Sequence, residues 1–265
     1  MNVNLKTALA CHELKLKRLF LNCFDDTLGF VNMFFANHFV PENTVIAEKD
    51  GRVIGMAFLL PCTAEGKPCF YIYGVCVAPD ERKNGIGSAL LKFAAEHAKS
   101  LGARVLLRPE NESLFSFYEK AGFSPCSYYK TETFASRENA ATLSPVSAEE
   151  YLTLRNRGFA DRNPVLWDKA AIEHALNHET FFGFSAYKFE VGDEAGILLC
   201  GKDGGEPFIK ETTASAAALP AVAAAALAFL GGEEITVLLP ADQSGTPYAY
   251  GIGFKNPVYL NLMLD

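Results

Sequence analysis

The segment Val77–Ser88 contains the residue types that hold phosphate groups in proteins. The preceding apolar run, residues 70–77, predicts a strand, and residues 88–101 predict a helix. Free N–H groups at a helix N-terminus, together with the helix dipole, attract anions. Between the two elements stand Arg82, Lys83, Gly85 and Gly87. The segment therefore predicts a pocket for a phosphate or pyrophosphate group.

Three kinds of phosphate-binding loop compete for this pattern. A dinucleotide loop requires G-x-G-x-x-G, and a nucleoside triphosphate loop requires G-x-x-x-x-G-K-[ST]. Neither order is present in this segment, because Gly85-Ile86-Gly87 has only Gly74 far upstream of it and no Lys-Ser pair follows a glycine. The order that is present is Arg-x-x-Gly-x-Gly, after a strand ending Val-x-Pro. An ordinary glycine-containing turn is the simpler interpretation that stays open.

This order resembles the acetyl-CoA loop of the GNAT superfamily of N-acyltransferases. Arg82, Gly85 and Gly87 occupy the marked positions, and Val77 and Pro79 fit the strand that leads into the loop. The resemblance implies that the loop holds the pyrophosphate of coenzyme A. It also implies that the sheet splits beside this strand, so that backbone groups there face the pantetheine amides.

A second segment, residues 109–123, strengthens the resemblance. It contains Asn111 and the run Tyr118-Glu119-Lys120-Ala121-Gly122-Phe123, and it looks like the GNAT segment Asn…Tyr-Glu-Lys-x-Gly-Phe. Ser113 or Asn111 can cap a helix that carries the tyrosine, and the glycine can end it in a left-handed cap. Acyl transfer from a thioester expels a thiolate, which a nearby phenol can protonate. The resemblance gives this role to Tyr118, and gives Asn111 a role in holding the pantetheine arm.

The resemblance thus implies an acyltransferase that moves acetyl from acetyl-CoA directly to a primary amine of a small molecule or peptide. The cofactor-binding residues that it implies are Val75, Val77, Arg82, Lys83, Gly85, Ile86, Gly87, Ser88 and Asn111. The amine must attack as the free base, so a general base or a water chain is required. Two carboxylates are candidates for that base: Glu110, beside the predicted helix, and Asp265, at the end of the chain. For both, a solvated carboxylate is the simpler interpretation.

Two other functions stay open at this point. One is a non-catalytic regulator that binds acyl-CoA but lacks an acceptor site. The other is a structural module in which an acidic second half mediates pairing, without affinity for coenzyme A. By family analogy, four phenylalanines of the helix expected at residues 25–38 line the acceptor side of the site. Packing of these side chains in the core, at the spacing of a helix face, explains them equally well. They are Phe30, Phe34, Phe35 and Phe39.

Composition and charge restrict the partners. The 265 residues are 49% hydrophobic and suffice for one large or two modest domains. Residues 1–130 carry 15 basic and 13 acidic side chains, and residues 131–265 carry 9 and 18. An acidic half argues against nucleic-acid binding, and either attracts a cationic amine or serves solubility. Superfamily members often pair, so a homodimer stays open.

Other patterns point to a cytoplasmic protein that does not enter a membrane. No signal peptide is visible at the start, and the longest apolar stretch, residues 214–230, is mostly alanine with Pro220 inside it. A packed helix is expected there. Seven cysteines without a CxxC motif indicate reduced core residues. No metal site is expected, since His174 and His178 lack a third ligand and are interpreted as a solvated pair.

The order of predicted elements is that of a GNAT fold, an α/β (α+β) architecture with a mixed central sheet flanked by helices. Residues 1–134 form the predicted acetyl-CoA-binding domain, residues 135–146 a linker, and residues 147–265 a second, degenerate GNAT-like domain. In the first half, strands are expected at 3–8, 44–48, 53–60, 68–77, 103–107 and 123–134, and helices at 13–24, 25–38 and 88–101. In the second half, helices are expected at 148–157, 166–178 and 220–230, and strands at 184–191, 196–200, 207–213 and 234–239.

Similarity between segments of the two halves of the sequence supports the second domain. Residues 105–109 resemble residues 237–240, and residues 118–123 resemble residues 248–254. The second strand-to-helix turn, Thr212-Thr213-Ala214-Ser215-Ala216, has no arginine and no glycine pair. The second domain is therefore not expected to bind coenzyme A.

Overall fold

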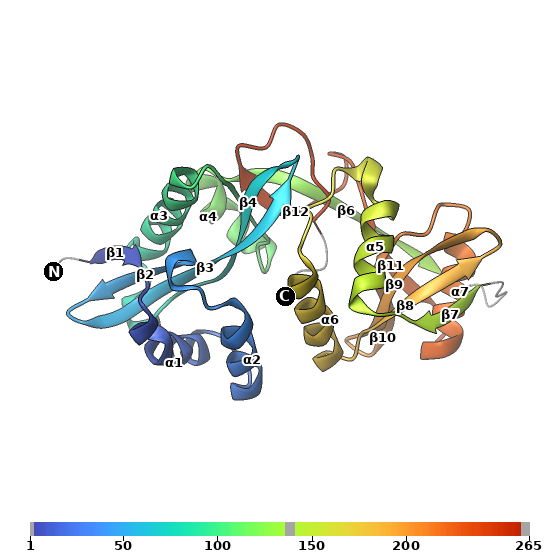
Figure 1. The fold of residues 1–265 in the computed structure, drawn as a ribbon, viewed down its shortest axis with the longest axis horizontal. Coiled ribbons are helices and arrows are strands. Elements are labelled where there is room, and N and C mark those ends of the chain that lie inside the picture. The colour runs from blue at the N-terminus through green and yellow to red at the C-terminus, as the bar shows by residue number, and fades with distance from the viewer. Residues whose placement is uncertain (1–2, 136–140, 261–265) are drawn as a thin grey trace. The chain divides into compact units, whose positions relative to one another are not determined.

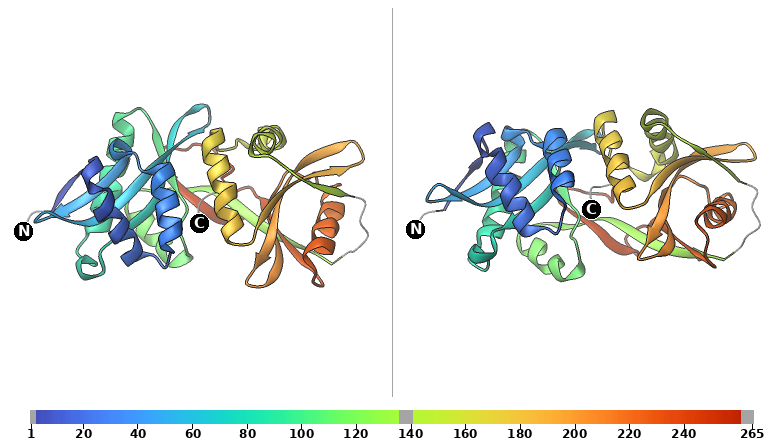
Figure 2. Two further views of the ribbon diagram at one scale, coloured as in Figure 1. Left: turned by 60° about the horizontal axis from the view of Figure 1, so that its bottom comes forward. Right: turned by 90° about the horizontal axis from the view of Figure 1, so that it is seen from below.

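The computed structural model describes residues 3–135 and 141–260 and divides into two compact units (Figures 1 and 2). Unit 1 contains Met1–Cys126 and Ala249–Lys255, and unit 2 contains Ser127–Tyr248 and Asn256–Asp265. Each unit thus includes a piece of the other half of the sequence. The limits 1–134 and 147–265 stay a prediction about which segments fold as domains.

Unit 1 has a mixed sheet in the order β1-β2-β3-β4-β5-β12. Its strands are β1 (Asn4–Thr7), β2 (Thr44–Lys49), β3 (Arg52–Ala64), β4 (Lys67–Val77) and β5 (Arg104–Leu107), joined by the end of β12 (Thr246–Ile252). Its helices are α1 (Glu13–Cys23), α2 (Leu28–His38), α3 (Ile86–Ser100) and α4 (Phe115–Lys120), with short 3-10 turns η1 (Ala10–His12), η2 (Pro41–Asn43), η3 (Pro79–Glu81) and η4 (Glu112–Leu114). Only β4 and β5 pair in parallel. Helices α1 and α2 cover one face and α3 the other (Figure 1).

The parallel pair separates along its length. Its last paired residues are Tyr71 and Leu106, and in the described part of the chain β4 continues to Val77 without a partner on the β5 side. The β3–β4 ladder also shifts in register here, around Gly74, which has a φ of +61°. A Cβ on this glycine would lie 3.1 Å from the Phe58 ring. The split expected from the sequence is therefore present, with a bulge in β4 beside it.

The start of α2 differs from the prediction. The helix expected at residues 25–38 begins at Leu28, so Asp25 and Asp26 precede it, and the Thr27 hydroxyl accepts a hydrogen bond from the Phe30 N–H at 3.2 Å. The threonine hydroxyl satisfies a free N–H group at the start of the helix, which is also what an aspartate does at this position. The two carboxylates are consequently left in the loop between α1 and α2.

Unit 2 repeats the element order of unit 1. It contains β7 (Thr142–Pro145), α5 (Ala148–Gly158), η5 (Ala160–Arg162), α6 (Lys169–Phe181), β8 (Ser185–Val191), β9 (Glu194–Asp203), β10 (Glu206–Thr212), α7 (Leu219–Leu230) and β11 (Ile235–Pro240). The sheet order is β6-β11-β10-β9-β8-β7, in which β6 (Ser124–Phe134) contributes its later residues and only β10 and β11 are parallel. Helices α5 and α6 cover one face and α7 the other (Figures 1 and 2).

Two expectations about the second half are wrong. Residues 142–145 of the expected linker form β7, which pairs antiparallel with β8, and residues 136–140 lie outside the described residues. Residues 248–254, which resemble residues 118–123 in sequence, do not form a helix like α4. They lie largely in β12, where Tyr250 pairs with Leu107. The alternation of large and small residues in β12 favours a strand, whereas α4 has a cap before it and a glycine after it.

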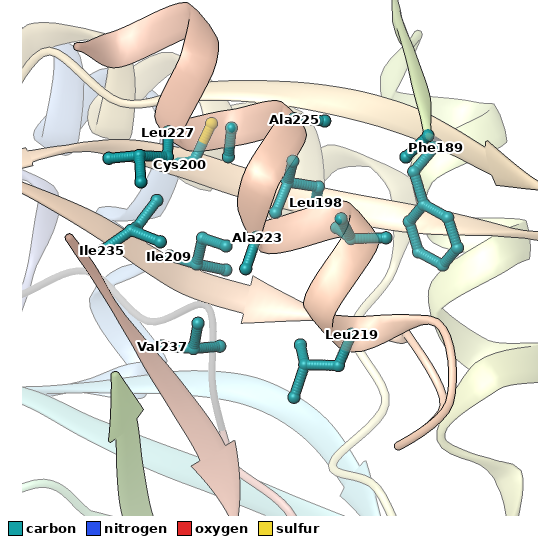
Figure 3. Close-up of a cluster of buried hydrophobic side chains, with 13 residues drawn as sticks. Phe189, Leu198, Cys200, Ile209, Leu219, Ala223, Ala225, Leu227, Ile235 and Val237 are labelled. Atoms are coloured by element: carbon teal, nitrogen blue, oxygen red, sulfur yellow. The ribbon is translucent and has the colours of Figure 1, made fainter. Parts of the chain in front are cut away.

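The alanine-rich segment is the packed helix that the sequence predicts. Figure 3 shows Ala223 and Leu227 of α7 facing Leu198, Ile209 and Val237 of the sheet. All five are at most 2% exposed, and small side chains let the helix approach the sheet closely. Within the described ranges, no helix combines the length and the apolar character that crossing a bilayer requires.

The histidines of α6 are not the solvated pair that we expected. His174 and His178 are both buried, and the His178 ring lies 4.8 Å from that of Phe182. Burial, followed by the charge of Lys210, lowers the pKa of His178 to about 4. The spacing alone did not reveal that this helix face turns inward. Among the described residues, no group of three His, Cys, Asp or Glu side chains could hold a metal ion.

A fully buried charged group holds α5 against the sheet of unit 2. Arg155 Nε lies 3.1 Å from Glu211 Oε2, and both residues are 0% exposed. The hydroxyls of Tyr151 and Tyr259 also donate to this carboxylate, at 2.6 and 3.1 Å. Each carboxylate oxygen is thus satisfied, which a buried charge requires.

Replacing Arg155 by leucine is expected to destabilise unit 2 by about 3–5 kcal/mol, because Glu211 then stays buried without its cation. Urea denaturation measures the change. The matched control is Arg157→Leu on the same helix, where an exposed guanidinium binds only the Ala195 carbonyl at 2.9 Å. Equal losses in the two variants would contradict the assigned importance of the buried pair.

Candidate functional site

The glycine loop leads from β4 into the 15-residue helix α3. Gly85 is the N-cap with a φ of +76°, and Lys83 has a φ of +65°. A positive φ at the cap suits glycine, which has no Cβ to clash. Ile86 is buried and anchors the first turn, whereas Arg82, Lys83, Gly85 and Ser88 are exposed. The first N–H groups of α3 therefore open onto an accessible, basic loop.

Two ion pairs fasten the chain just before this loop. Asp80 binds Arg52 at 2.6 Å, and Glu81 binds Lys49 at 2.8 Å. Both basic residues come from the β2–β3 hairpin. The hydrogen bond from Arg52 lowers the pKa of Asp80. The acidic side chains of η3 are thereby engaged, and Arg82 follows them directly.

The predicted phosphate-binding arginine lies at the end of β4. Its Nε donates to the Val77 carbonyl oxygen at 3.0 Å. That carbonyl is therefore occupied by protein, whereas Val75 lies in the register shift of β4. The resemblance places Val75 and Val77 beside the pantetheine arm. Of these two residues, Val75 lies at the bulge and Val77 lies beyond it.

Helix α4 is brought to the start of α3 by direct packing. A Cβ on Gly87 would lie 3.3 Å from the Phe117 ring, so the glycine makes room for this aromatic side chain. The Phe117 and Tyr118 ring centroids are 5.2 Å apart. Phe117 of α4 thus contacts the glycine loop, and Tyr118 is its neighbour in the helix. Phe117 has a positioning role that sequence analysis did not assign.

Tyr118 is suited to donate a proton. It is 8% exposed, and burial, followed by the charge of Glu110, raises its pKa to about 12. The side chain is therefore a neutral phenol near pH 7. Glu110 is exposed and close enough to act on Tyr118 electrostatically. Asp265, the other candidate base, lies outside the described residues.

Asn111 caps the short turn that precedes α4. Its Oδ1 accepts a hydrogen bond from the Ser113 N–H at 3.1 Å, as one of the two predicted caps requires. Gly122 ends the helix with a φ of +93°, the expected left-handed conformation. The capping oxygen of Asn111 is thus engaged locally.

Asp26 is a candidate that sequence analysis did not name as a site residue. It is partly buried in the α1–α2 loop, and burial, followed by the charge of Asp25, raises its pKa. Its charge in turn acts on Tyr73 of β4, whose ring centroid lies 5.0 Å from that of Phe34. Tyr73 directly precedes the Gly74 bulge. In the sequence, the feature that could have drawn attention to Asp26 is the adjacent carboxylate of Asp25.

The aromatic residues of α2 belong mainly to the core. Phe30, Phe34 and Phe35 are at most 5% exposed. Their rings surround Phe20 of α1, with centroid distances between 5.6 and 6.2 Å. These side chains therefore form the support under the α1–α2 loop, and Phe39 extends the group through its contact with Phe35 at 5.7 Å.

The corresponding turn in unit 2 has a different chemistry. The Ser215 N–H and hydroxyl both donate to the carboxylate of Glu194, at 2.8 and 2.6 Å. Two hydrogen-bond donors in the turn before α7 are therefore already bound by a carboxylate of the same chain. A cavity of about 500 Å³ adjoins this turn and is lined from β6, η5, β10 and β11.

Comparison with known proteins identifies the first part of the chain. Residues 12–123 match the acetyltransferase (GNAT) family and form a domain of that family. The chain is 29% identical over 97 residues to a mycothiol acetyltransferase from Propionibacterium freudenreichii, covering 35% of this chain and 31% of that protein. It is 34% identical over 76 residues to a glucosamine 6-phosphate N-acetyltransferase from Trypanosoma brucei brucei, covering 28% and 52%. The matched region thus spans about a third to a half of these curated relatives.

Solved structures extend the likeness in fold to nearly the whole chain. A probable N-acyltransferase from Enterococcus faecalis has a TM-score of 0.74 at 15% identity, over 95% of this chain and 72% of that chain. A GCN5-related N-acetyltransferase from Anabaena variabilis has a TM-score of 0.69 at 15% identity, over 94% and 72%. The predicted GNAT fold, a mixed sheet flanked by helices, is confirmed.

The loop geometry predicts that inorganic pyrophosphate binds at the start of α3. At about 30 times its Kd it should stabilise the protein by about 2 kcal/mol and raise the melting temperature by a few degrees. Arg82→Ala should weaken binding about tenfold or more, because it removes a charge-assisted hydrogen bond. The control is Arg18→Ala, at an exposed position on α1. A shift that survives in Arg82→Ala would place the anion elsewhere.

Proposed function

We propose that this protein is an N-acetyltransferase that moves an acetyl group from acetyl-CoA directly to a primary amine of a small molecule or peptide. The observation that carries the proposal is the contact between Gly87 of the basic glycine loop and Phe117, the neighbour of Tyr118 in α4. Membership of residues 12–123 in the GNAT family supports it. So do the printed names of the two curated relatives, both acetyltransferases.

The cosubstrate is assigned by the shape and charge of the β4 edge. The N–H groups at the start of α3, with Arg82 and Lys83, suit the diphosphate of coenzyme A. The unpaired edge of β4 beyond Tyr71 offers backbone groups to an extended arm that contains amides. The bulge at Gly74 and Val75 turns this edge at the level where the thioester is proposed to lie.

The chemistry then needs one proton donor and one proton acceptor. The amine nitrogen forms a bond to the acetyl carbon, and the carbon–sulfur bond breaks as the thiolate leaves. Tyr118 gives its phenolic proton to that sulfur, and a carboxylate takes the proton that the amine loses. Asp26 is the base that we favour, with Glu110 and Asp265 as the alternatives. A half-buried carboxylate beside Tyr73 also suits a cationic substrate.

Seven free cysteines and the proposed cosubstrate support a cytoplasmic location. A homodimer stays open. No observation favours the non-catalytic acyl-CoA regulator, and the next variant distinguishes it from an enzyme because a regulator has no turnover to lose.

Replacing Tyr118 by phenylalanine should lower kcat about a hundredfold, because the leaving thiolate loses its proton donor. The affinity for coenzyme A should be unchanged. Release of free thiol from acetyl-CoA, measured against a panel of amines, gives the rate, and a thermal shift gives the affinity. The control is Tyr187→Phe in β8 of unit 2. Unchanged turnover in Tyr118→Phe would contradict the assigned role.

Replacing Asp26 by asparagine should lower kcat/KM at least tenfold. In the unmodified protein, the rate should fall as the pH drops through the pKa of Asp26, which lies above the ordinary value of 3.8. The reason is that protonation removes the base, and this acidic limb should be absent from the variant. Asp25→Asn, at the adjacent exposed position, is the matched control. If the two variants behave alike, Asp26 is not the base.

A further inference from the structure

Two cysteine thiols meet beside the glycine loop. Cys23 is the last residue of α1, and Cys76 lies in β4, one residue before Val77. Each of these thiols shifts the pKa of the other, and Cys23 Sγ contacts the carbonyl of Val77, the residue that follows Cys76. Cys76 is 8% exposed, whereas Cys23 is half-buried and accessible to a small solute. The pair joins a helix end to the strand that leads into the loop.

The same cluster contains the loop arginine. Cys23 Sγ lies 3.6 Å from the Val77 carbonyl oxygen, which also accepts the hydrogen bond from Arg82 Nε at 3.0 Å. A guanidinium and a thiol that share one carbonyl are necessarily neighbours, and Arg82 lowers the pKa of Cys23. A positive charge in this position stabilises a thiolate.

The two sulfur atoms have different reactivity. The hydrogen bond from Cys76, followed by Arg82, lowers the pKa of Cys23 to about 7 against the opposing effect of burial. The hydrogen bond to Cys23, followed by burial, raises the pKa of Cys76. Near neutral pH, Cys23 is therefore the nucleophile and Cys76 stays a thiol. A reactive thiolate beside a second thiol is the arrangement in which oxidation ends in a disulfide.

We propose that Cys23 is an oxidation site whose product is a disulfide with Cys76, and that an anion bound at Arg82 protects it. In the first step the Cys23 thiolate attacks hydrogen peroxide, the O–O bond breaks, hydroxide leaves, and Cys23 becomes a sulfenic acid. In the second step the Cys76 sulfur attacks Cys23 Sγ and water leaves. In sum, two thiols and one peroxide give one disulfide and two waters, and an added dithiol reverses the reaction.

Protection by an anion follows from the shared arginine. A phosphate group that engages Arg82 neutralises the charge that stabilises the thiolate. The thiolate fraction of Cys23 then falls, and its reaction with peroxide slows. The site would link the oxidation state of the chain to the occupancy of its loop. This inference needs only an anion at Arg82 and does not depend on acetyl transfer.

The chain contains a matched control pair. Cys62 and Cys69 are directly opposite each other in the β3–β4 ladder, and Cys69 acts on the pKa of Cys62. The hydrogen bond to Cys69, followed by burial, raises the pKa of Cys62, and no arginine contributes there. The two pairs share a thiol–thiol contact and differ in the neighbouring cation. A difference in their rates therefore isolates the effect of Arg82.

The experiment treats the full chain with dilute hydrogen peroxide at pH 7 and follows each cysteine by peptide mapping and mass spectrometry. We expect a Cys23–Cys76 linked peptide to appear about tenfold or more faster than a Cys62–Cys69 link. Cys76→Ser should stop at a Cys23 sulfenic acid that dimedone traps. Arg82→Ala, an exposed change that leaves both thiols in place, should slow Cys23 oxidation about tenfold. Saturating inorganic pyrophosphate should slow it severalfold in the unmodified chain.

Three results would overturn the inference. One is oxidation of Cys23 no faster than that of Cys62 or of exposed Cys11. Another is an unchanged rate of Cys23 oxidation in Arg82→Ala, which would show that Arg82 does not activate the Cys23 thiol. The third is full reactivity of Cys23 under pyrophosphate that has been shown by thermal shift to be bound. Failure of acetyl transfer would appear only in the thiol-release assay and would leave all of these readouts intact.

Discussion

The divergence of two parallel strands is the constraint on which the site in unit 1 depends. Parallel neighbours cannot be joined by a tight turn, so β4 and β5 require the crossover helix α3. The helix therefore starts beside the carboxyl end of β4, with its free N–H groups at the edge that the divergence leaves open. The glycine loop, the unpaired end of β4 and the packing of α4 all follow from this one arrangement.

Unit 2 has the same arrangement without the basic glycine turn. It has the same parallel pair, with Phe208 opposite Thr236, and the same crossover helix, α7. The difference is local: the turn before α7 has no basic residue, and Glu194 already binds its Ser215 donors. Topology provides a helix start, and a few side chains decide whether a soluble anion can use it.

The α1–α2 loop connects core packing to chemistry. A buried group of phenylalanines around Phe20 holds both helices against the sheet. The chain between them therefore has a fixed position, in which Cys23 reaches the Val77 carbonyl and Asp26 acts on Tyr73. Two ionisable groups beside β4 thus owe their positions to an apolar cluster that itself does no chemistry.

The amino-acid sequence by itself determined the order of elements other than β7 and β12, the glycine loop at Arg82–Ser88 and the motif around Tyr118. Those features are local, since strand alternation, helix periodicity, caps and left-handed glycines are set by residues close together in the chain. Only the tertiary structure decided that Thr27 caps α2, that β12 is a strand of unit 1, and that His174 is buried. It also decided which groups face Tyr73 and Cys23. The physical reason is that burial and long-range contacts depend on which faces pack together, and charge, desolvation and reactivity change with that packing.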